Sequence, residues 1–365
     1  MTPRLRLAGM MGRSVAQTVS QLEHIMAGPG GGTVIDVSMG RLIGSPFGAL
    51  DGPDVAVVDE GLAWAAAHRA PVLLRVHYGY RCSAQWKAAV GAVSPWYTNE
   101  GGDTTQPPAP STVGKGNLWH ELPGGMIRFW DAQKLGPLYE DANAKMAARW
   151  ADHEWLAAVT VGMGESQYTE ICIRQIWVPE NRQLLGANGF STSADLAAFA
   201  ASVAVHERVW SPHGIASAVS YNTHQGIGDA PNFEADNSPA RTLAMIATQV
   251  ETLRGLGLIE NNSLMQDDTE YPTMYADLSQ RAHAGQPLHF QTRTYEKHVA
   301  AHTSGISPSV VGTVQRAIAL GASSVELPVR GTGAGLSASG ATLWPAMTTT
   351  QAADLNEQLH ANLTL

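Results

Sequence analysis

Short runs of β-forming residues alternate with longer stretches of helical character from about residue 33 onward. The first two runs are TVIDVS at 33–38 and PVLLRVHY at 71–78. Similar runs recur at 156–162, 214–221, 257–262, 287–292 and 323–329. Regular alternation of strands and helices is typical of a parallel sheet whose crossovers are right-handed.

Helices are predicted between these runs, and one more closes the chain. The strongest is SPARTLAMIATQVETLRGLG, which begins at Ser238 and Pro239 and ends at Gly255 and Gly257. The predicted helices are 58–68, 83–92, 137–150, 194–210, 238–257, 272–283, 307–321 and 348–363.

Residues 94–127 are irregular and rich in Gly, Pro and Thr, and we expect one short strand to lie within them. This strand and the seven readable ones give eight strand–helix units. Eight units fit a (β/α)8 barrel with enlarged βα loops better than an open sheet. No linker divides the chain, so we predict a single α/β TIM-barrel domain over 1–365, with the barrel itself at about 33–330.

Strand parity predicts which side chains point into the barrel, because successive residues face opposite sides of a strand. In PVLLRVHY, the apolar Val72, Leu74 and Val76 would face the helices. The same reasoning on four strands turns these residues inward: Asp36, Arg75, His77, His289, Gln291, Arg293 and Glu326. They lie late in their strands, at the end of the barrel where active sites form. A buried ion network that only fixes the core is the alternative interpretation.

The composition of the chain argues against several classes of binding partner. The chain has 32 acidic and 23 basic residues, with no polybasic run, so we expect no nucleic-acid partner. It has no apolar run of eighteen residues and no signal-peptide pattern at its start, which predicts a soluble protein without a membrane partner. The two cysteines form no metal-binding pattern, and we predict neither a metal nor a cofactor.

Several carboxylates with an arginine and a histidine at one barrel end favour acid–base chemistry. Glycoside hydrolysis needs one protonated and one ionised carboxyl group. The candidates are Glu165 and Glu170 after the fourth strand, Glu326 on the eighth, and Glu296 after the seventh. We prefer Glu170 and Glu326, with Arg75 lowering the pKa of the ionised partner.

Further residues are candidates for binding a sugar. Trp119 and Trp130 belong to a set of aromatic residues in or beside the long loops, where aromatic faces can pack on sugar rings. Arg174 follows Glu170 by four residues and could orient it on a helical turn. We expect residues 94–125 to cover the carboxyl end of the barrel.

Two resemblances support this interpretation. RFW at 128–130 and YEDANAKMAARWADHEWLAAVTV resemble the strand-4 region of the large clan of (β/α)8 retaining glycosidases. Glu165 then stands where that clan keeps the acid of an Asn-Glu pair, although Gly164 replaces the Asn. YTEICIRQ, FQTRT and GASSVELP are similar to an actinobacterial group of glycosidase-like barrels, some of them minor tail proteins of bacteriophages. This second resemblance implies Glu170 and Glu326 as the shared acids.

The expected partner is an oligo- or polysaccharide, such as a cell-envelope glycan, and other tail proteins if the chain belongs to a virion. It would otherwise be cytoplasmic. One alternative is a carbohydrate-binding or structural tail protein that keeps the barrel without turnover. A second is a phosphate-binding barrel enzyme using GTGAGLSASG at 331–340. A metal site through His77 and His289 is a weaker alternative.

Overall fold

The computed structural model describes most of the chain. The described residues are 6–93, 125–163, 170–171, 179–221, 226–227, 235–236, 240–266, 272–293, 309–328 and 347–363. None of the helices in these residues is long and apolar enough to cross a membrane.

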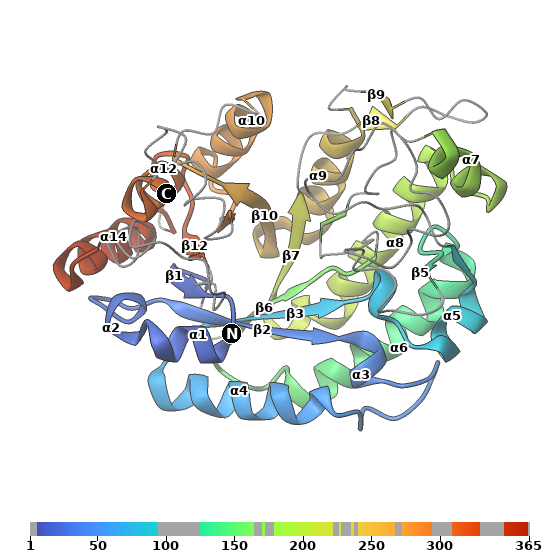
Figure 1. Ribbon diagram of the computed structural model, residues 1–365, viewed down its shortest axis with the longest axis horizontal. Coiled ribbons are helices and arrows are strands. Elements are labelled where there is room, and N and C mark those ends of the chain that lie inside the picture. The colour runs from blue at the N-terminus through green and yellow to red at the C-terminus, as the bar shows by residue number, and fades with distance from the viewer. Residues whose placement is uncertain are drawn as a thin grey trace, which may run out of the picture.

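Eight parallel strands close into a barrel at the centre of the molecule, and helices surround it (Figure 1). The order around the barrel is β1-β12-β11-β10-β7-β6-β3-β2. These strands are β1 (Gly9–Gly12), β2 (Gly32–Ser38), β3 (Val72–His77), β6 (Leu156–Thr160), β7 (Ala216–Tyr221), β10 (Gly257–Leu264), β11 (Leu288–Thr292) and β12 (Ser324–Glu326). The predicted (β/α)8 fold is confirmed.

The prediction was wrong about one strand. The eighth barrel strand is β1, which pairs with both β12 and β2, so the barrel begins at Gly9 rather than near residue 33. Its sequence, GMMG, is short, lacks β-branched residues and shows no alternation. The short strand within 94–127 is β5 (Met126–Ile127), but it pairs antiparallel with β4 (Ala92–Val93) in a separate two-stranded sheet.

Within the described residues, the helices follow the predicted positions closely, with four short additions that carried no clear periodicity. The added helices are α1 (Val15–Ser20), α2 (Leu22–Ile25), α3 (Met39–Leu42) and α7 (Pro179–Ala187). The predicted ones are α4 (Asp54–His68), α5 (Ala84–Val90), α6 (Ala132–Trp150), α8 (Thr192–Val209), α9 (Ala240–Leu253), α10 (Pro272–His283), α12 (Val310–Ala319) and α14 (Thr349–Ala361). Two further short strands, β8 (Gly226–Ile227) and β9 (Ala235–Asp236), pair with each other.

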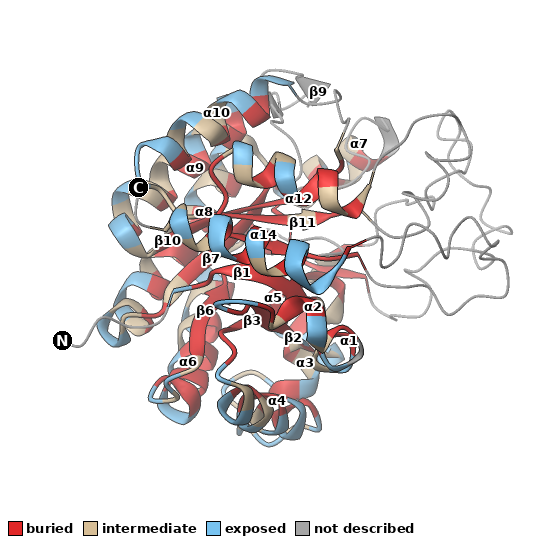
Figure 2. Ribbon diagram, turned by 90° about the vertical axis from the view of Figure 1, so that its left-hand side faces the viewer, coloured by how far each residue is buried: buried red, intermediate tan, exposed pale blue. Residues whose placement is uncertain are grey.

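The two faces of the barrel strands carry different side chains, as parity predicts. Outward residues such as Ile35, Val72 and Phe290 pack against the helices in two apolar clusters, and most residues of the barrel strands are buried (Figure 2). Inside, a first layer is apolar: Met11, Val34, Leu73, Ala158, Ala218 and Leu258. The polar inward residues form the next layer toward the carboxyl ends of the strands. Asp36, Arg75, Ser220 and Glu260 each follow a member of the apolar layer by two positions along the same strand.

Candidate functional site

Arg75 connects two buried carboxylates in the layer above the apolar floor. Its Nη2 donates to Glu260 Oε1 at 2.6 Å and also to Glu326 Oε1, while Nη1 donates to Glu326 Oε2 at 3.2 Å. Arg75 is only 3% exposed, and both glutamates are fully buried. The three side chains come from β3, β10 and β12, so the closed barrel is what brings them together.

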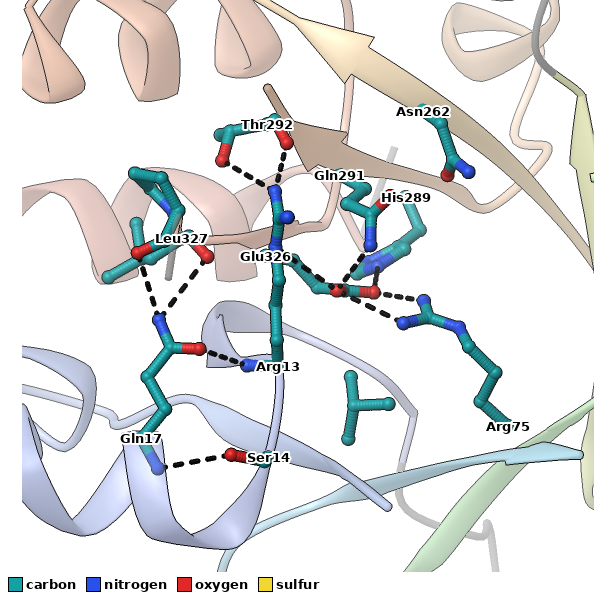
Figure 3. A network of polar contacts seen from close by, with 12 residues as sticks. Arg13, Ser14, Gln17, Arg75, Asn262, His289, Gln291, Thr292, Glu326 and Leu327 are labelled. Atoms are coloured by element: carbon teal, nitrogen blue, oxygen red, sulfur yellow. Dashed lines mark hydrogen bonds and ion pairs between the residues drawn. The ribbon is translucent and has the colours of Figure 1, made fainter. Parts of the chain in front are cut away.

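The carboxylate of Glu326 contacts several neighbouring polar side chains (Figure 3). Besides its bonds from Arg75, His289 Nε2 lies 3.1 Å from Oε1, and Gln291 Nε2 donates to Oε2 at 3.1 Å. Arg13, at the end of β1, places its Nε 3.9 Å from Oε2. Both carboxylate oxygens therefore have strong partners, an arrangement that favours the ionised form.

The environments of the two carboxylates separate their pKa values. For both, burial raises the pKa and the positive charge of Arg75 opposes it. At Glu326 the bonds from Arg75 and His289 prevail, and its pKa lies far below the usual range. At Glu260 burial prevails, helped by repulsion from Glu326, and the pKa is raised. A pair of nearby acids with pKa values pushed apart is the pattern that acid–base enzymes use.

Glu260 was not among the predicted site residues. Its Oε2 has no hydrogen-bond partner among the described residues, although the group is completely buried. The available signal was parity on the strand GLIENN, where an inward Leu258 would require an inward Glu260. The run of three polar residues after two apolar ones obscured that alternation.

Glu170 points into the barrel because the chain, beyond the end of β6, pairs with β7 again at this residue. The Val161 N–H donates to Ala218 O, and after an interruption the Ile171 N–H donates to Ser220 O at 3.0 Å. Glu170 thereby pairs with Ser220 as an isolated parallel bridge. Ile171 belongs to the outward apolar cluster, so its neighbour Glu170, which is 4% exposed, faces the interior.

The register places Glu170 and Glu260 in one row of inward residues. Ser220 pairs with Glu170 on one side and with Glu260 on the other, and Glu260 in turn pairs with His289. The backbones of the two glutamates are thus two strand spacings apart, roughly 10 Å.

Asp36 and His77 form a second polar group nearer the barrel mouth. His77 Nε2 lies 2.8 Å from Asp36 Oδ1, and Arg81 Nη1 lies 3.6 Å from the same oxygen. His77 is buried, whereas the Asp36 side chain is 36% exposed. Partial burial raises the pKa of Asp36, but the neighbouring His77, Arg75 and Arg81 lower it, and the net shift is downward.

The other predicted binding residues differ in their surroundings. Gln291 contacts Glu326 as described, and Arg293 is half-buried just beyond β11, with its N–H donating to Leu264 O. Trp130 is buried between Phe129 and Phe190, and its Nε1 donates to Asn188 O at 3.0 Å. These contacts pack Trp130 against its neighbours, and its role in binding a sugar stays a prediction.

Six predicted features lie outside the described residues. They are Glu165, Glu296, Trp119, Arg174, the glycine-rich segment 331–340 and, except for residue 125, the covering loop 94–125. Their roles remain predictions.

One set of side chains in the described residues has the composition of a metal site. Glu260, His289 and Glu326 each offer a ligand atom, and these atoms lie within 4.8 Å of one another. Carboxylate oxygen and imidazole nitrogen suit divalent transition metals. Arg75 already supplies positive charge to both carboxylates, so a cation could enter only by displacing it.

Comparisons with known proteins support the fold. No family model and no curated protein matches the chain. A GH5-4 broad-specificity endoglucanase from an uncultured bacterium aligns over 96% of this chain and 86% of its own, with a TM-score of 0.50 and 12% identity. A β-mannanase from the blue mussel Mytilus edulis aligns over 97% and 92%, with a TM-score of 0.48 and 12% identity. A morphinone reductase aligns over 89% and 81%, with a TM-score of 0.45 and 12% identity. At such low identity the likeness shows the barrel fold alone.

Proposed function

We propose that this barrel binds an oligo- or polysaccharide at the carboxyl ends of its strands and hydrolyses a glycosidic bond with two inward carboxylates. The observation that carries the proposal is the row containing Glu170 and Glu260, beside an arginine-held Glu326 whose charge helps to raise the pKa of Glu260. The barrel fold shared with an endoglucanase is consistent with it. The proposed substrate comes from the carboxylate chemistry, since the fold by itself implies no function.

Glu260 is the proposed proton donor, because its raised pKa keeps a proton available at higher pH than an ordinary glutamic acid would. Its proton passes to the glycosidic oxygen as the bond to the anomeric carbon breaks. Glu170 is the proposed second carboxylate, which attacks that carbon directly or removes a proton from the attacking water. The net change adds OH to the anomeric carbon and H to the leaving group.

Glu326 takes a different role from the one predicted. Since both of its oxygens accept bonds from Arg75, His289 or Gln291, it has no lone pair directed at a substrate. We propose that it is the fixed anion that orients Arg75 and, through Arg75, Glu260.

The test is hydrolysis of a glycan panel by the parent protein and by two isosteric variants. Glu260→Gln and Glu170→Gln should each lower turnover by at least about a hundredfold, the scale of a lost acid–base group. Glu251→Gln, an exposed site on α9, is the matched control and should keep parental turnover. Full turnover in either active-site variant would refute that residue's role.

A second function, carbohydrate binding without hydrolysis, is favoured by one observation. Glu260, His289 and Glu326 have no exposed surface, and their charges are paired among themselves and with Arg75. Binding of the same panel without any turnover would support this function. The resemblance to phage tail proteins adds a proposed place in a virion, which antibody labelling of purified particles would test.

A further inference from the structure

A buried ion pair lies outside the barrel wall, beside the point where the chain rejoins the β6–β7 ladder. Arg241, in the first turn of α9, donates from Nε to Asp195 Oδ2 at 2.6 Å. Asp195 lies in the first turn of α8. Both residues are at most 3% exposed, so the pair is a desolvated contact between two helices.

The guanidinium of Arg241 also holds the backbone that carries Glu170. Its Nη1 donates to Ile171 O at 3.2 Å, while the N–H of Ile171 donates to Ser220 O at 3.0 Å. Both peptide groups of Ile171 are therefore engaged, one by the helix layer and one by β7. Because Glu170 is the preceding residue, these two bonds determine where its side chain enters the barrel.

In the part of the chain that the structure describes, Glu170 and Ser220 form an isolated bridge, whereas the neighbouring barrel strands share runs of several paired residues. A buried ion pair contributes little net stability compared with apolar packing, but it fixes geometry where its partners converge. Arg241 suits this use because its planar fork can serve two acceptors at once.

We infer that Arg241 and Asp195 are positioning residues that fix Glu170 in the catalytic row, acting through the carbonyl of Ile171. The catalytic part of this inference rests on the proposed function of Glu170. The structural part, that the pair fixes the Glu170–Ile171 backbone, can be measured without any substrate.

The first measurement is hydrogen exchange of the Ile171 amide in Arg241→Lys. Lysine keeps the charge beside Asp195 but lacks the planar fork by which Arg241 reaches Asp195 from Nε and Ile171 O from Nη1. Exchange of this amide should quicken by at least about tenfold, as expected when local opening becomes easier. A second variant, Arg241→Met with Asp195→Leu, removes both charges together and should have the same local effect without leaving an unpaired ion.

Gln249→Met is the matched control. Gln249 is buried on the same helix and donates to Ser217 O and Leu258 O, so its loss disturbs α9 and β7 without touching Ile171. It should leave exchange of the Ile171 amide, relative to global stability, unchanged.

The second measurement is turnover. Arg241→Lys should lower kcat by about ten- to a hundredfold, the scale of a misplaced catalytic group, with KM nearly unchanged. In the Glu170→Gln background the same substitution should cause no further loss, because residues that act through one another are not additive. An additive loss would show that Arg241 acts independently of Glu170.

The outcomes separate this inference from the proposed function. Unchanged exchange of the Ile171 amide in both Arg241 variants overturns the positioning role, whatever the activity. If exchange quickens in the Arg241 variants but the parent protein hydrolyses no glycan, the fixing of Glu170 is upheld and the hydrolytic function is refuted.

Discussion

Two buried polar networks lie on opposite sides of the barrel wall, and their chemistry differs. The outer one joins α6, α8 and β7: Tyr139 Oη lies 2.8 Å from His206 Nε2, and His206 Nδ1 lies 3.0 Å from Ser217 Oγ. The Gly162 N–H donates to Tyr139 Oη at 3.1 Å. The inner one joins Arg75, Glu260, Glu326 and His289 through ion pairs.

The outer network is neutral and its hydrogen bonds follow one direction. Burial lowers the pKa of His206 to about 3, so the ring carries no charge near neutral pH. We assign the Tyr139 hydroxyl hydrogen to His206 Nε2, because the Gly162 N–H already donates to Tyr139 Oη, and we assign His206 Nδ1 as the donor to Ser217 Oγ. This arrangement stabilises the packing of two helices on the wall.

The inner network contains several charged groups, and one of its carboxylate oxygens has no hydrogen-bond partner among the described residues. Glu260 Oε2 has no hydrogen-bond partner among the described residues, and the pKa values of Glu260 and Glu326 shift in opposite directions. A fold gains nothing in stability from such an arrangement, since buried charges are costly and an unmet acceptor adds to the cost. The contrast is what distinguishes a candidate site from a structural contact.

The largest expected effect comes from removing the cation of the inner network. Arg75→Met leaves two carboxylates in the barrel interior without their common partner, and we expect the free energy of unfolding to fall by about 3–5 kcal/mol at pH 7. Urea unfolding measures this change. Arg149→Met is the control, because Arg149 pairs with Asp59 at an exposed site and should matter little.

The pH dependence of this deficit has a definite sign. In the parent, the lowered pKa of Glu326 contributes stability that is present above the unfolded-state pKa and is lost as pH falls below it. In Arg75→Met the unpaired carboxylates should instead have raised pKa values, so acid stabilises the variant. The deficit should therefore shrink between pH 7 and pH 4, and a constant deficit would contradict the ionic description.

The sequence allowed the inner network to be predicted only in part. Clean alternation in PVLLRVHY and PLHFQT assigned Arg75, His289 and Gln291 to the interior, because the face of a strand follows from parity alone. Glu260 was missed because three polar residues in succession hide the alternation of β10, whose pairing with β11 also shifts register after Asn261.

Long-range pairing limited the rest of the prediction. β1 was missed because GMMG has no periodic signal and becomes a strand only between β12 and β2. The inward direction of Glu170 depends on the chain rejoining β7 after it has left β6, which local sequence does not encode. The outer network has the same origin, since Tyr139, His206 and Ser217 come from three separate elements.

A smaller effect is expected from the outer network, in which His206 carries no charge near neutral pH. His206→Phe leaves Tyr139 Oη and Ser217 Oγ without their shared partner and should lower the free energy of unfolding by about 1–3 kcal/mol at pH 7. The pKa of His206 is depressed in the fold, so the unfolded chain binds the proton first and parental stability falls as pH drops from about 6.5 toward 3. The variant lacks that loss.

The difference in the free energy of unfolding between the parent and His206→Phe should therefore become smaller on acidification, as urea unfolding at pH 7 and pH 4.5 would show. His283→Asn, an exposed site on α10, serves as the control and should follow the parent at both pH values. A difference that widened in acid would mean that His206 is charged in the fold.

The smallest effect compares the serine that each histidine contacts. Ser217→Ala and Ser324→Ala each remove one hydrogen bond, at 3.0 Å from His206 Nδ1 and 2.7 Å from His289 Nδ1, and each should cost about 1 kcal/mol in urea unfolding.

The two hydrogen bonds run in opposite directions. Glu326 only accepts, so His289 donates from Nε2 and, when neutral, accepts at Nδ1 from the Ser324 hydroxyl, whereas His206 donates from Nδ1 to Ser217. Nitrogen-15 shifts of the two imidazoles in the parent should therefore report opposite tautomers when both rings are neutral. Ser324→Ala should leave His289 on Nε2, because the bond to Glu326 remains, and Ser217→Ala should leave His206 on Nδ1, because Tyr139 still donates to Nε2. The same tautomer in both rings would remove the distinction between the two networks.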